Sequence, residues 1–437
     1  MRLEWNRLLS DWRTPYPGQN PGPSSTNEFR SHFQSDYDRV VFSQPFRRLA
    51  RKTQVHPMAP DAVHNRLTHS IEVASVGRSF ASRLAAFLKE RGELPDDRSA
   101  SDLSWILMSA CVTHDIGNPP FGHAGEYAIR EWALSHADEI FPPGVDISHE
   151  SRQDVLIFEG NAQGFRIASR VDNENVGHLR LTFATLGAMV KYPWSSTDPR
   201  ADKKKKYNCF SSEAKLFELV FDSMGLRRPG GDFARHPLSF FSEAADDICY
   251  RVLDLEDAAE LGIVTESYVR DVFQRFLRDV PNDIPLSQMR GRVIHQMIDE
   301  CWEIFVRDYD AIMNGDRQND LKSDFAEELQ AGLAEVGKTY AMIFAETSKV
   351  IVELGAYKAI GRILKALCLA THKLSVHQDF GELMFISRRC LELAWSIDFL
   401  KANQTQPYEW WLHQILDYVS GLTDNYTRQL SREIEGI

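Results

Sequence analysis

The sequence predicts an all-α protein, and two observations lead to this expectation. Apolar residues recur at helical spacing over several long stretches, whereas alternation with a period of two residues is scarce. The composition, with 43% hydrophobic and 26% charged residues in a chain of 437, is that of an ordinary globular protein. We therefore expect one mostly helical body whose C-terminal half is also helical.

The predicted elements follow in chain order. Residues 14–27 are rich in Pro, Gly, Ser and Asn, and they predict an irregular surface arm. The run VLIFEG at 155–160 is the best strand candidate, and the polar segment 192–212 is the clearest break in the helical pattern. Helices are expected at 69–89, 102–114, 239–260, 341–369 and 382–401.

Charge and cysteine content restrict the class of protein. Lys and Arg number 50 against 62 Asp and Glu, and the net charge of −12 argues against broad nucleic-acid binding, although a local basic pocket remains compatible. The six cysteines are scattered without a CxxC pair, which favours reduced thiols over a disulfide framework. No apolar run approaches about 18 residues and no export signal is present, so we expect a cytoplasmic protein without a membrane span.

Four residues of metal-ligand type lie at the ends of predicted helices or along them. Two imidazoles and two carboxylates suit a borderline to hard divalent cation. Each residue is weak evidence alone, because a lone histidine near a helix start is more often a cap or a surface residue. The four are His69, His114, Asp115 and Asp246.

The adjacent residues His114 and Asp115 need a helix end if both are to bind one ion. Neighbouring helical side chains point about 100° apart, so both can reach an ion only where the helix stops against it. Gly117, Pro119 and Pro120 supply such an end. The sequence thus predicts that the helix ends directly beside the ligand pair.

Five sequence blocks occur in a characteristic order. They are FRRLARKTQV (46–55), HNRLTHSIEVASVGR (64–78), THDIGNPPFGHAGE (113–126), FEGNAQGFRI (158–167) and HPLSFFSEAADDICYRVLDLEDA (236–258). Residues 36–260 thereby resemble the HD-domain hydrolases, and more closely the bacterial deoxyguanosinetriphosphate triphosphohydrolase family, itself similar to the animal SAM-and-HD-domain dNTPase. The C-terminal third matches less sharply, through GAYKAIGRIL (355–364) and YVSGLTDNY (418–426).

The resemblance implies a metal centre with a catalytic pair beside it. His69, His114, Asp115 and Asp246 would hold one divalent metal, which could be Mg, Mn, Fe, Co, Ni or Zn. His123 and Glu126 match the family's catalytic pair, and their spacing on an early helical turn lets the carboxylate orient the imidazole. From the residues alone, the alternative is a helix cap followed by a first-turn acid.

The resemblance also implies a substrate site of focused positive charge. Basic candidates in or near the first block include Arg48, Arg51 and Lys52, and Arg66 lies one turn before His69. The run Lys203–Lys206 could equally be a solvated loop, and EGNAQ could be only a capped turn. The predicted substrate-binding residues are Arg47, Gln54, Arg66, Asn161, Lys191, Tyr192, Lys206, Tyr250 and Asp254.

Three of the predicted site residues share one helical row. Asp246, Tyr250 and Asp254 are spaced i, i+4 and i+8, which covers about 12 Å and fits a phosphate at one end and a deoxyribose at the other. In the family, Tyr250 would pack where a ribose 2′-OH projects, and Asp254 with Gln54 would hold the 3′-OH. The alternative is an ordinary helix whose acids face water.

Two departures limit what the resemblance transfers. The animal enzyme has Lys directly after its last metal-binding Asp, whereas this chain has Asp247, so phosphate contacts from that position are not expected. Tyr207 and Asn208 replace the aromatic-Gly step that is more frequent in the family, and this weakens the role given to Lys206. The bacterial branch is therefore the better guide.

The expected activity is hydrolysis of a dNTP to the deoxynucleoside and inorganic tripolyphosphate. One rival is another HD phosphohydrolase, such as a cyclic-nucleotide phosphodiesterase or a nucleoside 5′-monophosphatase, and a second is a regulator that senses dNTP or single-stranded DNA. A dNTP or single-stranded DNA could also be an effector of the enzyme. A homo-oligomer, from dimer to hexamer, is a family expectation. The expected regions are an arm (1–38), a phosphohydrolase core (39–260) and a helical region packed on it (261–437).

Overall fold

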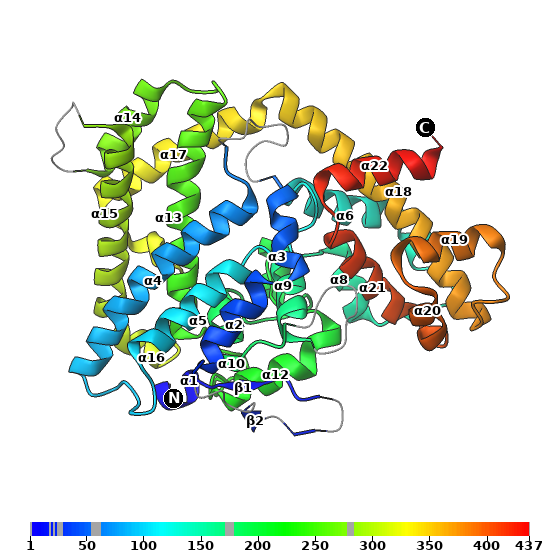
Figure 1. Ribbon diagram of the computed structural model, residues 1–437, viewed down its shortest axis with the longest axis horizontal. Helices are drawn as coiled ribbons and strands as arrows, with labels where there is room; N and C mark the ends of the chain where they lie inside the picture. The colour runs from blue at the N-terminus through cyan, green and yellow to red at the C-terminus, as the bar shows by residue number, and fades with distance from the viewer. Residues whose placement is uncertain are drawn as a thin grey trace.

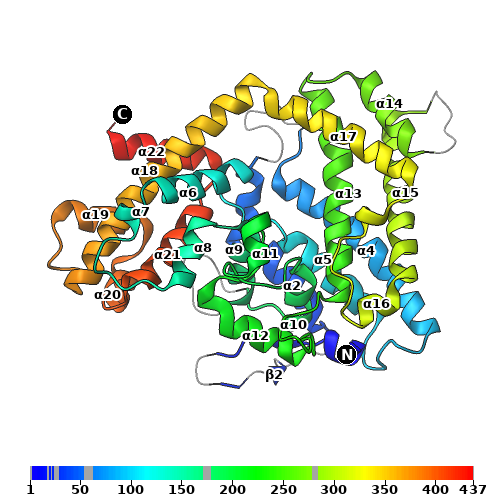
Figure 2. The same ribbon diagram turned by 180° about the vertical axis from the view of Figure 1, so that it is seen from behind.

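The computed structural model describes residues 2–16, 19–20, 22–23, 29–53, 63–170, 179–277 and 284–436, and its regular secondary structure is almost all helical (Figure 1; Figure 2 gives the reverse view). The predicted all-α class is confirmed. Isolated bridges aside, the described residues hold one strand pair, antiparallel between β1 (Trp12–Arg13) and β2 (Gly22–Pro23) in the predicted arm. None of the described helices combines the length and the apolar run needed to cross a bilayer.

The helices fall into two sets along the chain. The first set is α1 (Trp5–Leu8), α2 (His32–Val41), α3 (Gln44–Arg48), η1 (Leu49–Arg51), α4 (Arg66–Glu90), α5 (Ala100–Thr113), α6 (His123–Ser135), α7 (Ala137–Ile140), α8 (His149–Leu156), α9 (Gly160–Ser169), α10 (Phe183–Met189), α11 (Pro199–Lys204), η2 (Ser211–Glu213) and α12 (Ala214–Ser223). The second set is α13 (Pro237–Glu260), α14 (Glu266–Phe276), α15 (Leu286–Arg307), α16 (Tyr309–Met313), η3 (Lys322–Asp324), α17 (Glu327–Ala345), α18 (Thr347–His377), α19 (Phe385–Ala394), α20 (Ile397–Asn403), α21 (Tyr408–Ser420) and α22 (Asp424–Glu435).

Side-chain caps fix where two of the central helices begin. The side chain of Asn65 accepts hydrogen bonds from the backbone N–H groups of Leu67 and Thr68 at the start of α4. Ser99 and Asp102 form a reciprocal capping box at the start of α5. Such caps satisfy backbone donors that the first helical turn leaves unpaired, and each stabilises its helix by about 1 kcal/mol.

Three predicted helices lie close to their expected bounds. The patterns at 69–89, 102–114 and 239–260 correspond to α4, α5 and α13. The pattern at 341–369 is split between α17 and α18 at Glu346, whose side chain accepts a hydrogen bond from the Lys349 N–H and so begins a new helix. The pattern at 382–401 is likewise divided between α19 and α20.

The predicted strand at 155–160 is wrong. Val155 belongs to the last turn of α8, and the carboxylate of Glu159 caps α9 by accepting from the Asn161 N–H. Ile157 and Phe158 are buried between the two helices. A short apolar run is compatible with a strand or with a buried helix junction, and periodicity alone does not separate them.

Two clusters of buried apolar side chains form the interior. The larger cluster draws on α2, α4, α5, α10 and α12 to α17, and it continues across the predicted boundary at residue 260. The smaller cluster draws mainly on α6, α8 and α18 to α22. In Figure 1, α14, α15 and α17 lie at one end of the molecule and α19 and α20 at the other, with the long α18 running between them.

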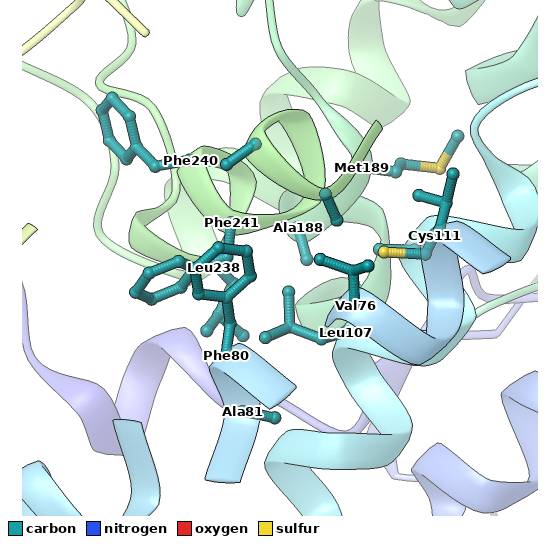
Figure 3. Close-up of a cluster of buried hydrophobic side chains, with 14 of the residues drawn as sticks. Val76, Phe80, Ala81, Leu107, Cys111, Ala188, Met189, Leu238, Phe240 and Phe241 are labelled. Atoms are coloured by element: carbon teal, nitrogen blue, oxygen red, sulfur yellow. The ribbon is translucent and has the colours of Figure 1, made fainter. Parts of the chain in front are cut away.

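The larger cluster packs the helices that bear the predicted metal ligands. Figure 3 shows side chains of α4, α5, α10 and α13 meeting there, including Leu107 of α5. Phe80 of α4 stacks on Phe241 of α13 with 4.9 Å between ring centroids, and both rings are fully buried. Each such side chain contributes roughly 1.5–3 kcal/mol through burial, which holds the helices in a fixed relation.

Candidate functional site

A polar pocket opens between the two hydrophobic clusters. Its volume is about 1180 Å³ with the open mouth included, and elements from α4 to α18 contribute to its wall. Among the predicted site residues that the structure describes, all except Arg47 line this one pocket. They are Arg66, His69, His114, Asp115, His123, Glu126, Asn161, Lys191, Tyr192, Lys206, Asp246, Tyr250 and Asp254.

The four predicted metal ligands converge on one wall of the pocket. Ligand atoms of His69, His114 and Asp115 all lie within 4.8 Å of one another. Asp246 completes the group, since its Oδ1 lies 3.2 Å from Nε2 of His69 and 3.4 Å from Nε2 of His114. Two imidazole nitrogens with two carboxylates form a donor set that fits a divalent cation.

The backbone determines which nitrogen of His114 faces this group. Nδ1 of His114 lies 2.6 Å from the carbonyl oxygen of Cys111, and only a protonated nitrogen can donate to that acceptor. The other nitrogen, Nε2, then carries the lone pair and faces Asp115 and Asp246. This tautomer is the one that a ligand histidine needs.

The turn after α5 brings Asp115 next to His114. α5 ends at Thr113, and Gly117 then packs directly against α9: a Cβ atom there would lie 2.1 Å from the backbone nitrogen of Gly164. Only glycine allows this approach. The side chain of Asn118 donates a short hydrogen bond to Asp115 and orients its carboxylate.

Both carboxylates of the group are held in their ionised form. Burial would raise the pKa of Asp115, but Arg66, His114 and His69 outweigh it and lower the pKa to about 2. Burial would also raise the pKa of Asp246, but Lys191, His114 and His69 lower that pKa well below the usual range. Lys191 donates to Asp246 at 2.7 Å. The group therefore presents negative charge, as a cation site requires.

The predicted catalytic pair lies on the first turn of α6. Nδ1 of His123 lies 3.1 Å from Oε2 of Glu126, and Oε1 of Glu126 accepts from the Gly160 N–H at 2.9 Å. The His123 side chain is 66% exposed, whereas Glu126 is buried. Glu126 thus fixes Nδ1 of the imidazole and leaves Nε2 accessible to a ligand in the pocket.

A second buried carboxylate, Glu159, lies next to this pair. Lys206 Nζ is 3.0 Å from both oxygens of Glu159 and 3.8 Å from Glu126, and Arg130 also contacts both carboxylates. Burial would raise the pKa of Glu126, but Lys206, His123 and Arg130 lower it. Burial and the charge of Glu126 instead raise the pKa of Glu159.

Arg66 links the metal-type group to the turn before α6. Its Nη1 donates to Asp115 at 2.7 Å, whereas its buried Nε has no hydrogen-bond partner among the described residues. Gly122 has φ +59°, and a Cβ atom there would lie 2.3 Å from Nη2 of Arg66. A glycine at 122 therefore leaves room for the guanidinium beside the turn.

The far end of the pocket is aromatic. The rings of Tyr250 and Tyr340 stack with 4.9 Å between centroids and 16° between planes, and the Tyr340 hydroxyl donates to the Tyr250 carbonyl oxygen at 3.1 Å. Asp254 lies beside them, and burial raises its pKa to about 7. The row Asp246–Tyr250–Asp254 thus follows the pocket wall from the metal-type group to this end.

The structure leaves one predicted residue, Arg47, outside the pocket. Arg47 is exposed on α3, where its guanidinium donates to the Phe42 carbonyl oxygen, and it does not line the pocket. The sequence signal for Arg47 was only its position in a basic block. Gln54 lies outside the described residues.

Other lining residues escaped the sequence analysis. Asn118 and Glu159 fall inside the recognised blocks, so their polar character was a signal that could have found them. Tyr340, Lys349 and Glu353 belong to α17 and α18, where the resemblance is weakest, and only the fold brings them to the pocket. Asp247 also lines the pocket, but it pairs with Lys322 at 2.6 Å.

The fold and the pocket define an all-α protein with a group of imidazoles and carboxylates able to hold a metal ion. A Pseudomonas aeruginosa (strain LESB58) protein named deoxyguanosinetriphosphate triphosphohydrolase-like protein is 38% identical, with 99% of each chain covered. A Synechocystis sp. protein of the same name is 33% identical over 100% of both chains. The chain belongs to this deoxyguanosinetriphosphate triphosphohydrolase-like family.

A third relative extends the comparison. The deoxyguanosinetriphosphate triphosphohydrolase of Enterobacter sp. (strain 638) is 30% identical over 97% of this chain and 96% of its own. No family model matches the sequence. The relationship therefore rests on alignments that cover essentially the whole chain.

Proposed function

We propose that the protein hydrolyses deoxynucleoside triphosphates to the deoxynucleoside and inorganic tripolyphosphate. One observation carries the proposal: a metal-type group, a His–Glu pair and several cations line a single pocket. The names of the relatives support the same class of reaction. Water would add across the bond between the α-phosphorus and O5′, leaving OH on phosphorus and H on O5′.

The four ligands would hold the metal. His69, His114, Asp115 and Asp246 present nitrogen and oxygen donors together, and the two carboxylates are ionised. A divalent cation bound there would polarise a phosphate oxygen and offset charge that develops in the transition state. Arg66, Lys191 and Lys206 would bind the remaining phosphate oxygens, because a triphosphate needs several cations at once.

His123 would move the proton. Its Nδ1 is held by Glu126, so Nε2 is the nitrogen that can reach the scissile bond. Glu126 is itself anchored by the Gly160 N–H, which fixes the pair relative to α9. The exposed imidazole would give a proton to O5′ as that bond breaks, and it would regain one from solvent afterwards.

Tyr250 and Asp254 would select the sugar. The Tyr250 ring is held by its stack on Tyr340, so it cannot readily move aside for a 2′-OH. Asp254 is buried and has one carboxylate oxygen, Oδ1, with no hydrogen-bond partner among the described residues, so it is suited to bind a sugar hydroxyl.

Product analysis tests the proposal. The full-length protein is incubated with each of the four dNTPs, singly and in pairs, with Mg²⁺ or Mn²⁺, and with the four ribonucleotides as controls. We expect deoxynucleoside and tripolyphosphate in equal amounts, and little turnover of ribonucleotides. Release of orthophosphate or pyrophosphate would indicate another phosphohydrolase, and binding without turnover under every condition would indicate a sensor.

A further inference from the structure

A second cavity lies between α3 and the C-terminal helices, outside the pocket described above. Its volume is about 830 Å³ with the mouth included. Trp395, Tyr418 and Tyr426 supply aromatic surface, and Leu393 and Leu422 supply aliphatic surface. Aromatic walls of this kind accommodate a flat ring better than a flexible chain.

The polar groups of this cavity do not suit a phosphorylated ligand. Arg48 is the one cationic side chain among the described residues that line it, beside the single acid Asp417, whereas four Lys and Arg side chains line the first pocket. Asp417 is already bound by Arg166, through two contacts of 2.8 Å. The buried Gln414 also lines the cavity, and its Nε2 has no hydrogen-bond partner among the described residues. An uncharged ring with a hydrogen-bond acceptor fits these features.

The cavity wall is joined to the turn that precedes the predicted catalytic pair. Gly421, Leu422 and Thr423 line the cavity, and the residues on either side of them are linked by hydrogen bonds to the turn that contains Asn118 and Phe121, which line the first pocket. On one side, the Ser420 carbonyl oxygen accepts from Lys52 Nζ at 2.6 Å, and Lys52 also donates to the Asn118 carbonyl oxygen at 2.6 Å.

Asp424 makes the connection on the other side. Its carboxylate accepts from the Phe121 N–H at 2.8 Å and from the Thr53 N–H at 3.0 Å. Phe121 precedes His123 by two residues, and the Asn118 side chain orients Asp115. A ligand that orders or shifts residues 421–423 would therefore act on the turn that positions both the metal-type group and the His–Glu pair.

We propose that this cavity is a second ligand site, for an uncharged deoxynucleoside, and that its occupancy alters turnover through residues 420–424. The identity of the ligand rests on the proposed function, because a deoxynucleoside is the product of that reaction and a phosphate-free nucleobase compound. Bound at the first pocket, a product competes with substrate and raises KM. Bound at the second site, it changes kcat.

The experiment has a binding arm and a kinetic arm, both with the full-length, metal-loaded protein. Deoxyguanosine, deoxyadenosine, deoxycytidine, thymidine and a non-hydrolysable dNTP are titrated by equilibrium dialysis. Each is then added to hydrolysis assays over a range of dNTP concentrations up to saturation. Leu393→Trp fills the cavity, and Tyr426→Ala removes aromatic surface at a residue that is 43% exposed. Leu369→Trp, at an exposed position on α18 away from the cavity, is the matched control.

We expect at least one deoxynucleoside to change kcat twofold or more, and both cavity variants to weaken its binding about tenfold while Leu369→Trp does not. A purely competitive effect, or an effect that both cavity variants retain, would overturn the proposal. A response to a non-hydrolysable dNTP that the same variants abolish would overturn the ligand class. If no dNTP is hydrolysed at all, the proposed function fails. The dialysis comparison of the variants would then still show whether the cavity binds a deoxynucleoside.

Discussion

Glu126 and Glu159 are buried side by side, and the charge of Lys206 lies between them. Their environments move the two pKa values in opposite directions. Lys206, His123 and Arg130 keep Glu126 ionised despite burial, whereas burial and the neighbouring charge of Glu126 raise the pKa of Glu159. Glu126 is therefore the carboxylate that holds the imidazole, and Glu159 binds Lys206 and caps α9.

At the residue scale, His123→Ala should remove the proton donor while leaving the fold intact. We expect kcat to fall by about 10²–10⁴-fold, the usual contribution of one proton-transferring group, with little change in KM. His295→Ala is the matched control, because His295 is 72% exposed, similar to His123 at 66%, and lies outside the pocket. Normal turnover by the His123 variant would refute the assigned role.

Asp254 should make stability depend on pH in an unusual direction. Burial raises its pKa from the usual 3.8 of an aspartate to about 7, so the folded state binds a proton that the unfolded state has already lost. Its contribution is therefore present below pH 4 and is lost as the pH rises to 7, at most about 4 kcal/mol. Asp254→Asn should gain stability relative to wild type as the pH rises from 5 to 8.

Urea unfolding at pH 5 and pH 8 measures this difference. The wild type and Asp254→Asn are compared at both values, with Asp97→Asn as a control on a side chain that is 73% exposed. The control should follow the wild type at both pH values. If the difference in free energy of unfolding between wild type and Asp254→Asn is the same at pH 5 and pH 8, the pKa of Asp254 is not raised.

At the scale of elements, helical periodicity was sufficient where one face of a helix packs on the core. α4, α5 and α13 follow that rule and were predicted close to their bounds. Periodicity does not show where one helix ends and the next begins without a polar gap. The cap at Glu346 splits α17 from α18 within a continuous amphipathic pattern, and the buried residues Ile157 and Phe158 join two helices in the manner of a short strand.

The turn between α21 and α22 should support activity although it contacts no predicted metal ligand. Asp424→Ala removes the acceptor for the backbone N–H groups of Thr53 and Phe121. Leaving such donors unpaired costs about 1–3 kcal/mol each. We expect the melting temperature to fall by several degrees and kcat to fall about tenfold, with helix content preserved in circular dichroism.

Asp398→Ala is the control for this change. Asp398 is also an acid in a first helical turn, on α20, but it is exposed and lies outside both cavities. Its loss should lower the free energy of unfolding by about 0.3–1 kcal/mol, because the interaction with the helix dipole is removed, and should leave kcat unaltered. Equal effects of the two substitutions would show that Asp424 acts only as a helix-start acid.

At the scale of the whole molecule, the site depends on how two hydrophobic clusters meet. The predicted ligands come from helices of the larger cluster, whereas His123 and Glu126 lie on α6, which packs in the smaller one. The motifs indicated most of the predicted residues that line the pocket, because each motif is local. They did not indicate Tyr340 or Lys349, since those residues reach the pocket only through the path of α17 and α18. Arg47 was predicted to bind substrate but lies outside the pocket, because a basic block does not specify which of its side chains points inward.

Because the predicted ligands come from helices of the larger cluster, removal of the metal should affect the stability of those helices most. A cation bound by His69, His114 and Asp246 joins α4, the end of α5 and α13, and a ligand at 100 times its Kd stabilises the folded state by about 2.7 kcal/mol. Mn²⁺ should therefore raise the melting temperature above that measured with a chelator.

In hydrogen exchange, protection should increase in α4, α5 and α13 more than in α19 to α21. His114→Ala should lose both effects, whereas His295→Ala should keep them. A shift that persists in His114→Ala would place the cation elsewhere in the molecule, and the proposed metal site would then be wrong.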